Sequence, residues 1–436
     1  MRLYKNQLFV SSLFLLSILC ACAQRNVYAH EAHLSELPVD TVSVNVSILG
    51  TPKNGIINIS DTIDLNHRAC TIPAGIILNF KGGVIKNGTL VGNMTQVKSS
   101  RACFSRLRIQ GTWNVPVIKS SYFCDLNYDN SLKDVMALSN PAVKNKVVIE
   151  KGVYQVSAFK NHDVCVPVCS NTELIVNGTI VLTPNQLLSY NIIRAKGFNI
   201  KIHGNGAVVG DKQSHLVESG EWGTGIDIDS CNHMSVYGLT IKDCWGDCIY
   251  IGGKSNDVTI EGCILDNGRR QGISITSAND VVVKNCSIKN VSGTNPQYAI
   301  DVEPNKGEIV DMVTIQKVST ENCVGGFLAY GRAEGAKIGS ITIRDCNVSS
   351  IDRTTIHMEK CDKVTIERCN IIQPKEKRII YCLSVNNVII QRNRLMYDRN
   401  IIKGIKGVAR EKLGKELGYI TISGSKIKNV RNNIEQ

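Results

Sequence analysis

The sequence NDVTIEGCIL at residues 256–265 decides the fold, because the chain repeats it 23 residues later as NDVVVKNCSI at residues 279–288. The same pattern returns as ITIRDCNV at 341–348, VTIERCNI at 364–371 and VIIQRN at 388–393. Each copy alternates apolar and polar residues and is punctuated by Gly, Asn or Asp, which is typical of short strands separated by turns. Self-similarity at such a period indicates a solenoid of stacked repeats.

Each repeat also contains a second short strand, whose first inward residues are Ile226, Ile249, Ile273, Ile300, Phe327 and Ile356. The segments between these strands leave no room for a helix. Two or three short strands per turn of about 23 residues predict an all-β fold, a single-stranded parallel β-helix. A short helix is expected at 409–417 and a closing strand at 419–423. The stretch VVIEKGVY at 147–154 resembles the opening strand of right-handed pectate-lyase-like β-helices. That resemblance implies a right-handed coil and a short capping helix, here at 132–144.

The N-terminus carries the signature of export. Residues 1–21 have a basic start followed by an apolar run that is too short for a membrane span, which predicts a signal peptide. The stretch Leu19-Cys20-Ala21-Cys22 resembles a bacterial lipobox, so Cys22 is the expected lipid anchor, with a plain secretory peptide cut near Ala23 as the alternative. The expected location is the outer membrane or cell surface, as a lipoprotein, or the periplasm.

The remaining chain divides into two expected regions. Residues 22–111 form an N-terminal strand-rich segment or the first coils, and residues 112–436 form the regular β-helix. A membrane contact is expected only through the N-terminal lipid, because no later apolar run approaches the roughly 20 residues of a spanning helix.

The charge balance favours an anionic partner. The chain of 436 residues has 50 Lys and Arg against 38 Asp and Glu, a formal net charge of +12, and loses two positive charges with residues 1–21. A basic exported protein suits an acidic polysaccharide such as a polyuronate or a sulfated glycan. No nucleic acid is expected, because the basic residues are spread along the chain without a recognisable motif. A solvated basic surface without a special partner is the alternative.

The 17 cysteines would ordinarily suggest disulfides in an exported chain. The repeat instead places Cys263, Cys286, Cys346 and Cys369 in one inward column, which also holds Leu239, Val318 and Asn393. Neighbouring coils lie about 4.8 Å apart, but parallel Cβ directions disfavour a bond between them. Most cysteines are therefore expected to pack as small apolar core residues. Cys165 and Cys169 could form a disulfide or simply pack together, and no metal site is expected.

Alternation along the second strands places polar side chains in outward columns. One column contains Asp227, Tyr250, Ser274, Asp301, Leu328 and His357, and the column two residues later contains Asp229, Gly252, Thr276, Glu303, Tyr330 and Glu359. The preceding turns contribute Trp222, Trp245, Asp247, Arg269, Arg270, Gln271 and Tyr298. Carboxylates, arginines and aromatic rings are thus expected together on one face, where a glycan chain could lie.

Two reactions suit these residue types. Hydrolysis needs two carboxyl groups about 5 to 9.5 Å apart, for which Asp247 could pair with Asp301 or with Asp227. Elimination from a uronate needs a cation to neutralise the carboxylate and a base for the C5 proton, and Arg269 or Arg270 could supply the cation. Asp227 and Asp301 could then bind Ca²⁺, the one cofactor considered. The predicted catalytic residues are Asp247, Asp301, Arg269, Arg270, Asp227 and Glu303, and the predicted substrate-binding residues are Trp245, Gln271, Tyr298, Tyr250, Tyr330 and His357. The alternative to a catalytic role is that the Asp residues of this set only cap turns through local hydrogen bonds.

The motifs at residues 225–227 (GID), 246–249 (GDCI) and 271–275 (QGISI) resemble the successive motifs of polygalacturonases. Three positions depart from that family's pattern. Thr224 stands at the first catalytic Asp, only the second acid of the Asp pair is present, as Asp247, and Gln271 replaces the His. One acid of three does not carry that family's inverting mechanism across.

Residues 267–275 and 298–305 resemble more broadly the right-handed parallel β-helix proteins of the pectate-lyase superfamily, including exported bacterial proteins and phage tailspikes. The resemblance implies contact with a glycan, and the analogy with tailspikes leaves a homotrimer open as an alternative to a single chain. The expected function is that of an exported polysaccharide hydrolase or lyase acting on an acidic or plant-type glycan. The alternative is a surface glycan-binding or adhesion protein without catalysis.

Overall fold

The computed structural model describes residues 43–124, 126, 131–373, 378–397, 420–431 and 433–435. The predicted signal peptide, the lipid-anchor residue Cys22 and the helix expected at 409–417 lie outside these residues. Among the described residues, no helix is long and apolar enough to cross a membrane.

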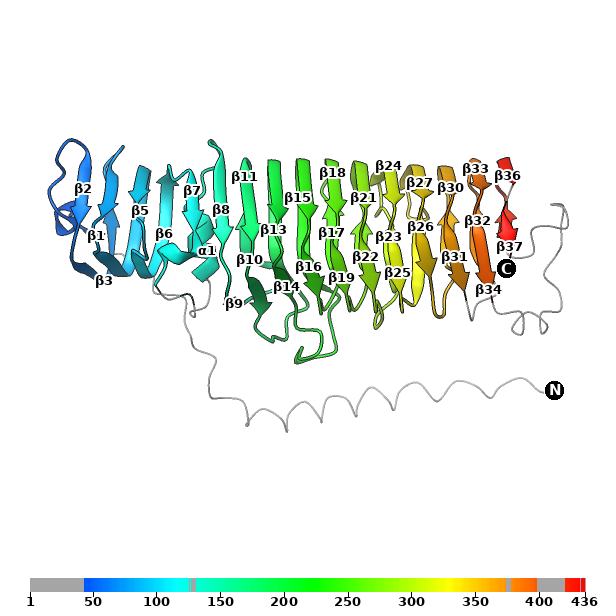
Figure 1. The fold of residues 1–436 in the computed structure, drawn as a ribbon, viewed down its shortest axis with the longest axis horizontal. Coiled ribbons are helices and arrows are strands. Elements are labelled where there is room, and N and C mark those ends of the chain that lie inside the picture. The colour runs from blue at the N-terminus through cyan, green and yellow to red at the C-terminus, as the bar shows by residue number, and fades with distance from the viewer. Residues whose placement is uncertain are drawn as a thin grey trace, which may run out of the picture. The chain divides into compact units, whose positions relative to one another are not determined.

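From residue 117 onward the strands form three parallel stacks, and the chain passes through the stacks in the same order in each coil (Figure 1). Stack A contains β10 (Asp163–Val168), the first parts of β13 (Ser189–His203) and β15 (Trp222–Tyr237), β17 (Ile249–Gly252), β20 (Ile273–Ile275), β23 (Tyr298–Val302), β26 (Gly325–Tyr330), β29 (Ile356–Glu359), β32 (Ile380–Leu383) and β35 (Ile420–Ser423). Stack B contains β7 (Val117–Lys119), β8 (Asn145–Ile149), β11 (Thr172–Val176), the second parts of β13 and β15, β18 (Ser255–Glu261), β21 (Ala278–Lys284), β24 (Ile309–Gln316), β27 (Lys337–Arg344), β30 (Cys361–Glu367), β33 (Asn387–Gln391) and β36 (Ile427–Arg431). Stack C contains β9 (Val153–Val156), β12 (Thr179–Leu182), β14 (Ala207–Val209), β16 (Thr240–Lys242), β19 (Ile264–Asp266), β22 (Ser287–Lys289), β25 (Ser319–Glu321), β28 (Asn347–Ser349), β31 (Asn370–Gln373), β34 (Arg394–Tyr397) and β37 (Ile434–Glu435).

The part of the chain before residue 117 forms a further parallel sheet of six strands. These are β1 (Ser43–Val44), β2 (Ile56–Ile59), β3 (Thr62–Thr71), β4 (Ile77–Phe80), β5 (Val84–Lys98) and β6 (Phe104–Trp113), with one 3-10 turn at Val46–Leu49. Phe104 forms a parallel bridge with Phe123, and the two ring centroids lie 5.4 Å apart. One hydrophobic core therefore continues from this sheet into the three stacks.

Two expected elements differ from the structure near this junction. The helix α1 (Ser131–Ala137) ends earlier than predicted, because Pro141 has no N–H to continue it and the Asn140 N–H donates to the Asn145 side chain at 3.0 Å. A second 3-10 turn covers Ser120–Tyr122. The expected opening strand at 147–154 is in fact the end of β8 and the start of β9, with a turn at Gly152, whose φ is 154°. The closing strand is confirmed as β35.

The predicted inward column is confirmed. Register pairs connect its members from one strand of stack A to the next, and each side chain is fully buried: Ile226, Ile249, Ile273, Ile300, Phe327 and Ile356. Burying a side chain of this size stabilises the fold by about 1.5–3 kcal/mol. The same register fixes the outward neighbours, so it determines which polar side chains can meet on the surface.

The cysteines are core residues, as predicted. Among the described residues, 13 cysteines are buried and none takes part in a disulfide. Cys165 is buried and Cys169 is half-buried, and they are not bonded to each other. Asn393 belongs to the same inward column and is satisfied there, because its Nδ2 donates to the Ile366 carbonyl at 3.0 Å and its Oδ1 accepts from the Cys369 N–H at 2.9 Å.

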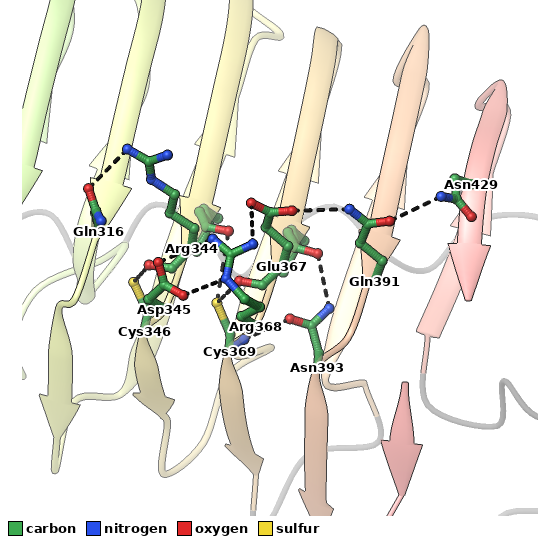
Figure 2. Close-up of polar contacts among 12 residues, drawn as sticks. Gln316, Arg344, Asp345, Cys346, Glu367, Arg368, Cys369, Gln391, Asn393 and Asn429 are labelled. Carbon is green, nitrogen blue, oxygen red and sulfur yellow. Dashed lines mark hydrogen bonds and ion pairs between the residues drawn. The ribbon is translucent and has the colours of Figure 1, made fainter. Parts of the chain in front are cut away.

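Polar side chains cross the coils on the outside of stack B, next to this cysteine column (Figure 2). Arg368 contacts Asp345 at 2.7 Å on the preceding coil and Glu367 at 2.8 Å. The adjacent row contains the hydrogen-bonded pairs Arg344 with Gln316, Gln391 with Glu367 and Asn429 with Gln391. Pairs of this exposed kind are worth about 0–1 kcal/mol each, so their main effect is to hold neighbouring coils in register.

We expect thiol reagents to separate the cysteines by burial. Burial raises the pKa of Cys70 to about 11 and that of Cys382 to about 12, which suppresses the reactive thiolate. At pH 8, alkylation followed by peptide mass mapping should label exposed Cys124 and half-buried Cys169, while the buried cysteines react only after unfolding. Rapid labelling of Cys263 or Cys286 in the native protein would contradict the core assignment.

Candidate active site

A cleft of about 370 Å³ lies on the outer face of stack A. Its walls come from six successive coils, from that of β10 to that of β23, and the outward columns predicted from the sequence form its floor. The lining residues are His162, Ser189, Tyr190, Asn191, Arg194, Trp222, Thr224, Asp227, Tyr250, Arg270, Ser274, Thr276, Asp301, Glu303 and Asn305.

Asp301 and Glu303 form a carboxyl pair at one end of the cleft. They are outward neighbours on and just after β23, and each carboxyl group shifts the pKa of the other, while the buried Asp301 Oδ1 accepts no hydrogen bond from any described residue. Burial raises the pKa of Asp301 well above its usual range, and the charge of Glu303 raises it further. Burial also raises the pKa of Glu303, although the nearby Arg270 opposes this shift. A buried carboxyl pair of raised pKa at a cleft is suited to acid-base chemistry.

Gln271 fixes the orientation of this pair from below. Its Nε2 donates to Asp301 Oδ2 at 2.8 Å, and its Oε1 accepts from the Tyr298 N–H at 2.9 Å. Gln271 is fully buried, and Tyr298 is buried against Gly325, where any Cβ would touch the ring. Both residues were predicted to bind substrate, but the structure places them beneath the cleft floor.

Asp247 lies beneath the cleft instead of lining it. Its Oδ2 accepts from Arg270 Nη1 at 3.1 Å and from Ser274 Oγ at 2.8 Å, and both of these residues line the cleft. Burial raises the pKa of Asp247, whereas Arg270 and Ser274 lower it, and the net shift is upward. The geometry therefore indicates that Asp247 positions Arg270. Burial lowers the pKa of Arg270, but its electrostatic interactions with Asp301 and Glu303 raise it.

Arg194 and Asp227 form an ion pair at the opposite end of the cleft. Arg194 Nε donates to Asp227 Oδ2 at 2.6 Å, and burial raises the pKa of Asp227 against the effect of this arginine. The register runs from Asp227 through Tyr250 and Ser274 to Asp301. Three strand spacings amount to about 14 Å. Asp227 and Asp301 are thus too far apart to bind one Ca²⁺ at ligand distances of about 2.3–2.6 Å.

Arg269 and Trp245 interact with each other outside the cleft. The Arg269 guanidinium lies 3.7 Å from the Trp245 ring centroid and donates to the carbonyls of Gly220 and Glu218. The other face of Trp245 stacks on His215, with ring centroids 4.0 Å apart. The structure therefore does not bring Arg269 and Trp245 together with the carboxyl pair, although Arg269 was a predicted catalytic residue and Trp245 a predicted sugar platform.

The outward columns continue beyond the cleft toward the C-terminal coils. His357 lies between the rings of Tyr330 and Tyr381, with centroid distances of 6.4 and 4.9 Å. Glu359 is buried beneath them, accepts from Arg332 and lies 3.3 Å from His357 Nε2. Tyr330 and His357 therefore share a surface, one and two coils away from Asp301 respectively.

Several cleft residues escaped the sequence prediction, above all Arg194 and Trp222. Arg194 occupies the predicted outward column one coil before Asp227, and extending the column backward would have found it. Trp222 was noted among the turn residues but not assigned a role, and its side chain is 56% exposed at the rim of the cleft. Tyr250, a predicted binding residue, does line the cleft and hydrogen-bonds to Thr276 at 2.8 Å.

The fold is that of a right-handed parallel β-helix. Residues 178–340 match the family model described as a right-handed beta helix region. The chain is 29% identical over 184 residues to the uncharacterized protein YclG of Bacillus subtilis strain 168, a match that covers 35% of this chain and 31% of that protein. The chain thus matches about a third of that relative's length.

Solved structures with the same type of fold include two polygalacturonases. The hyperthermoactive exopolygalacturonase of Thermotoga maritima is 12% identical with a TM-score of 0.46, covering 73% of this chain and 91% of that one. The polygalacturonase of Erwinia carotovora is 10% identical with a TM-score of 0.46, covering 71% and 93%. The resemblance in fold predicted from the sequence is confirmed. A proposal about function therefore has to be argued from the side chains of the cleft.

We expect Asp301→Asn to stabilise the protein at neutral pH. The pKa of Asp301 in the folded protein lies well above the ordinary carboxyl pKa of about 3.9. The free energy of unfolding of the wild type therefore falls as the pH rises from about 3.9 through the raised pKa. Asn cannot ionise and can still accept from Gln271. The melting temperature of the variant should match wild type near pH 3.5 and exceed it by about 1–3 °C at pH 8.

Asp311→Asn is the matched control for this measurement. Burial raises the pKa of Asp311, but hydrogen bonds from Ser340 and Met312 lower it more, so its net shift is downward. Its ionised form therefore stabilises the fold above the ordinary carboxyl pKa, and Asp311→Asn should lose stability as pH rises. If both variants change in the same direction with pH, the assigned burial of Asp301 is wrong.

Proposed function

We propose that this protein cleaves an acidic polysaccharide by β-elimination in the cleft of stack A. The observation that carries the proposal is the neighbouring carboxyl pair Asp301 and Glu303, which lines the cleft together with Arg270. A guanidinium neutralises the carboxylate of a bound uronate, and the carboxyl pair exchanges protons with the sugar.

The spacing of the cleft carboxyls favours elimination over hydrolysis. Hydrolysis uses two carboxyls about 5 to 9.5 Å apart. Asp301 and Glu303 are neighbouring carboxyls on one face of the chain and perturb each other directly, whereas Asp227 lies about 14 Å from Asp301 by register. Asp247 is absent from the cleft lining. Among the lining carboxyls of the described chain, Asp227 and Asp301 are therefore too far apart to act as a hydrolytic pair.

The proposed reaction leaves the pair in its starting protonation state. The ionised carboxylate removes the C5 proton, the C5 electrons form a double bond to C4, and the C4–O bond breaks. The protonated carboxyl then gives its proton to the departing oxygen. Because both carboxyls belong to one pair, proton removal and delivery take place on the same face of the sugar. Arg270 is held by Asp247 and offers its remaining N–H donors to the uronate carboxylate.

A glycan-binding protein without catalysis is the second candidate. The exposed ring of Trp222 and the guanidinium of Arg194 could hold a sugar at the cleft rim without any chemistry. The two candidates differ in turnover: binding alone leaves the polymer intact.

Asp301→Asn and Glu303→Gln should each lower kcat/KM on polyuronates by at least about 100-fold, because general acid-base groups contribute that much. The assay should follow the ultraviolet absorbance of the unsaturated uronate and, in parallel, new reducing ends. Asp229→Asn is the matched control, since Asp229 lies on the same face but is paired with Lys196. Reducing ends without unsaturation would show hydrolysis, and intact polymer across a panel of acidic glycans would favour binding alone.

Tyr330→Ala and His357→Ala should affect long substrates more than short ones. Tyr330 lies one coil and His357 two coils beyond Asp301, or about 5 and 10 Å along the axis. We expect KM for the polymer to rise about fivefold with little change in kcat, and the shortest cleaved oligosaccharide to be unaffected. Tyr237→Ala is the control, because Tyr237 stacks on His203 on a different face. Equal effects on long and short substrates would exclude an extended binding surface.

A further inference from the structure

A second groove, of about 690 Å³, lies on the outer face of stack B. It runs across five successive coils, from β8 to β18, and so lies on a different stack from the cleft. Its floor follows one register row, Lys146, Glu173, Lys201, Ser235 and Thr259. The cleft chemistry described above uses none of these residues.

The groove has an excess of positive charge available to a ligand. Lys144, Lys146 and Lys201 line it, and none of them has an ion-pair partner within 4 Å in the described part of the chain. Its two acids are already engaged, because Glu173 contacts His203 at 3.0 Å and Asp257 contacts His233. An anion entering the groove would meet three lysines without displacing an existing ion pair.

The spacing and chemistry of the lining favour a linear, hydroxyl-rich polyanion. Lys146 and Lys201 lie two strand spacings apart, about 10 Å. Glu173 lies between them in the row, and Ser235 and Thr259 follow beyond Lys201. Asn199 lies beside the row, and its Nδ2 donates to Asn171 at 3.2 Å. The lining contains no Trp, Tyr or Phe on which nucleic-acid bases could stack.

We propose that this groove is a second, non-catalytic binding site for an acidic polysaccharide. Carboxylates along the polymer contact Lys146 and Lys201, and the sugar hydroxyls hydrogen-bond to Glu173 between the two lysines and to the Ser, Thr and Asn side chains beside them. A polymer held on stack B raises the effective concentration of the same polymer at the cleft of stack A. The site does not depend on cleavage, so it stands or falls separately from the proposed elimination.

The test measures binding of fluorescent polygalacturonate to the full chain carrying Asp301→Asn, which prevents cleavage. Adding Lys146→Gln and Lys201→Gln should weaken binding about tenfold. The matched control adds Lys284→Gln and Lys289→Gln, which remove two lysines paired with Glu261 and Glu321, and should change affinity less than twofold. Equal losses in the two double variants, or no loss in either, would overturn the proposal.

Lysine acetylation of the same Asp301→Asn protein, read by mass spectrometry, gives a second readout that needs no groove variant. Polygalacturonate should protect Lys146 and Lys201 at least fivefold, and neutral dextran should not. Protection confined to residues of the cleft face, or equal protection by a single-stranded DNA oligonucleotide, would overturn a polysaccharide site here. If polygalacturonate protects Lys146 and Lys201 but the wild-type protein gives no unsaturated product, the groove proposal holds and the elimination is refuted.

Discussion

The stacked inward column of isoleucines is the constraint on which the rest of the structure depends. Each member, from Ile226 to Ile356, is fully buried and paired in register with the next coil. Because side chains alternate along a strand, a slip of one residue would turn this column outward and bury the polar neighbours. The loss of apolar burial, about 1.5–3 kcal/mol for each residue, makes such a slip costly. The position of every cleft residue on stack A follows from this register.

The carboxyl groups of the cleft reduce the stability that the core provides. Asp301, Asp247 and Asp227 are nearly fully buried, and burial raises the pKa of each. Asp227 and Asp247 are compensated by arginines, whereas burial and the charge of Glu303 together raise the pKa of Asp301 well above its usual range. Structural ion pairs would explain the first two acids. The third lines the cleft beside Glu303, as the acid-base role proposed above requires.

The sequence predicts what strand alternation controls and little of what the turns control. Spacing alone gave the inward column and the outward column from Asp227 to His357, and the register confirms both. It could not show that the turn residue Arg270 reaches the cleft while its neighbour Arg269 stacks on Trp245, because a turn has no fixed period. The depth of Asp247 was likewise hidden, since it depends on where the coil bends. Helix α1 was overestimated because the pattern carried past Pro141.

The two grooves follow from the same geometry as the core. A coil with three strands presents three outward faces, and any row of outward residues repeats every 4.8 Å or so along the axis. A linear polymer therefore finds regularly spaced partners on whichever stack carries suitable side chains. On stack A these are acids with arginines, and on stack B they are lysines and two acids with hydroxyls and amides. The proposed elimination needs the buried carboxyls of raised pKa on the first face, whereas the exposed lysines of the second supply the contacts of the proposed binding site.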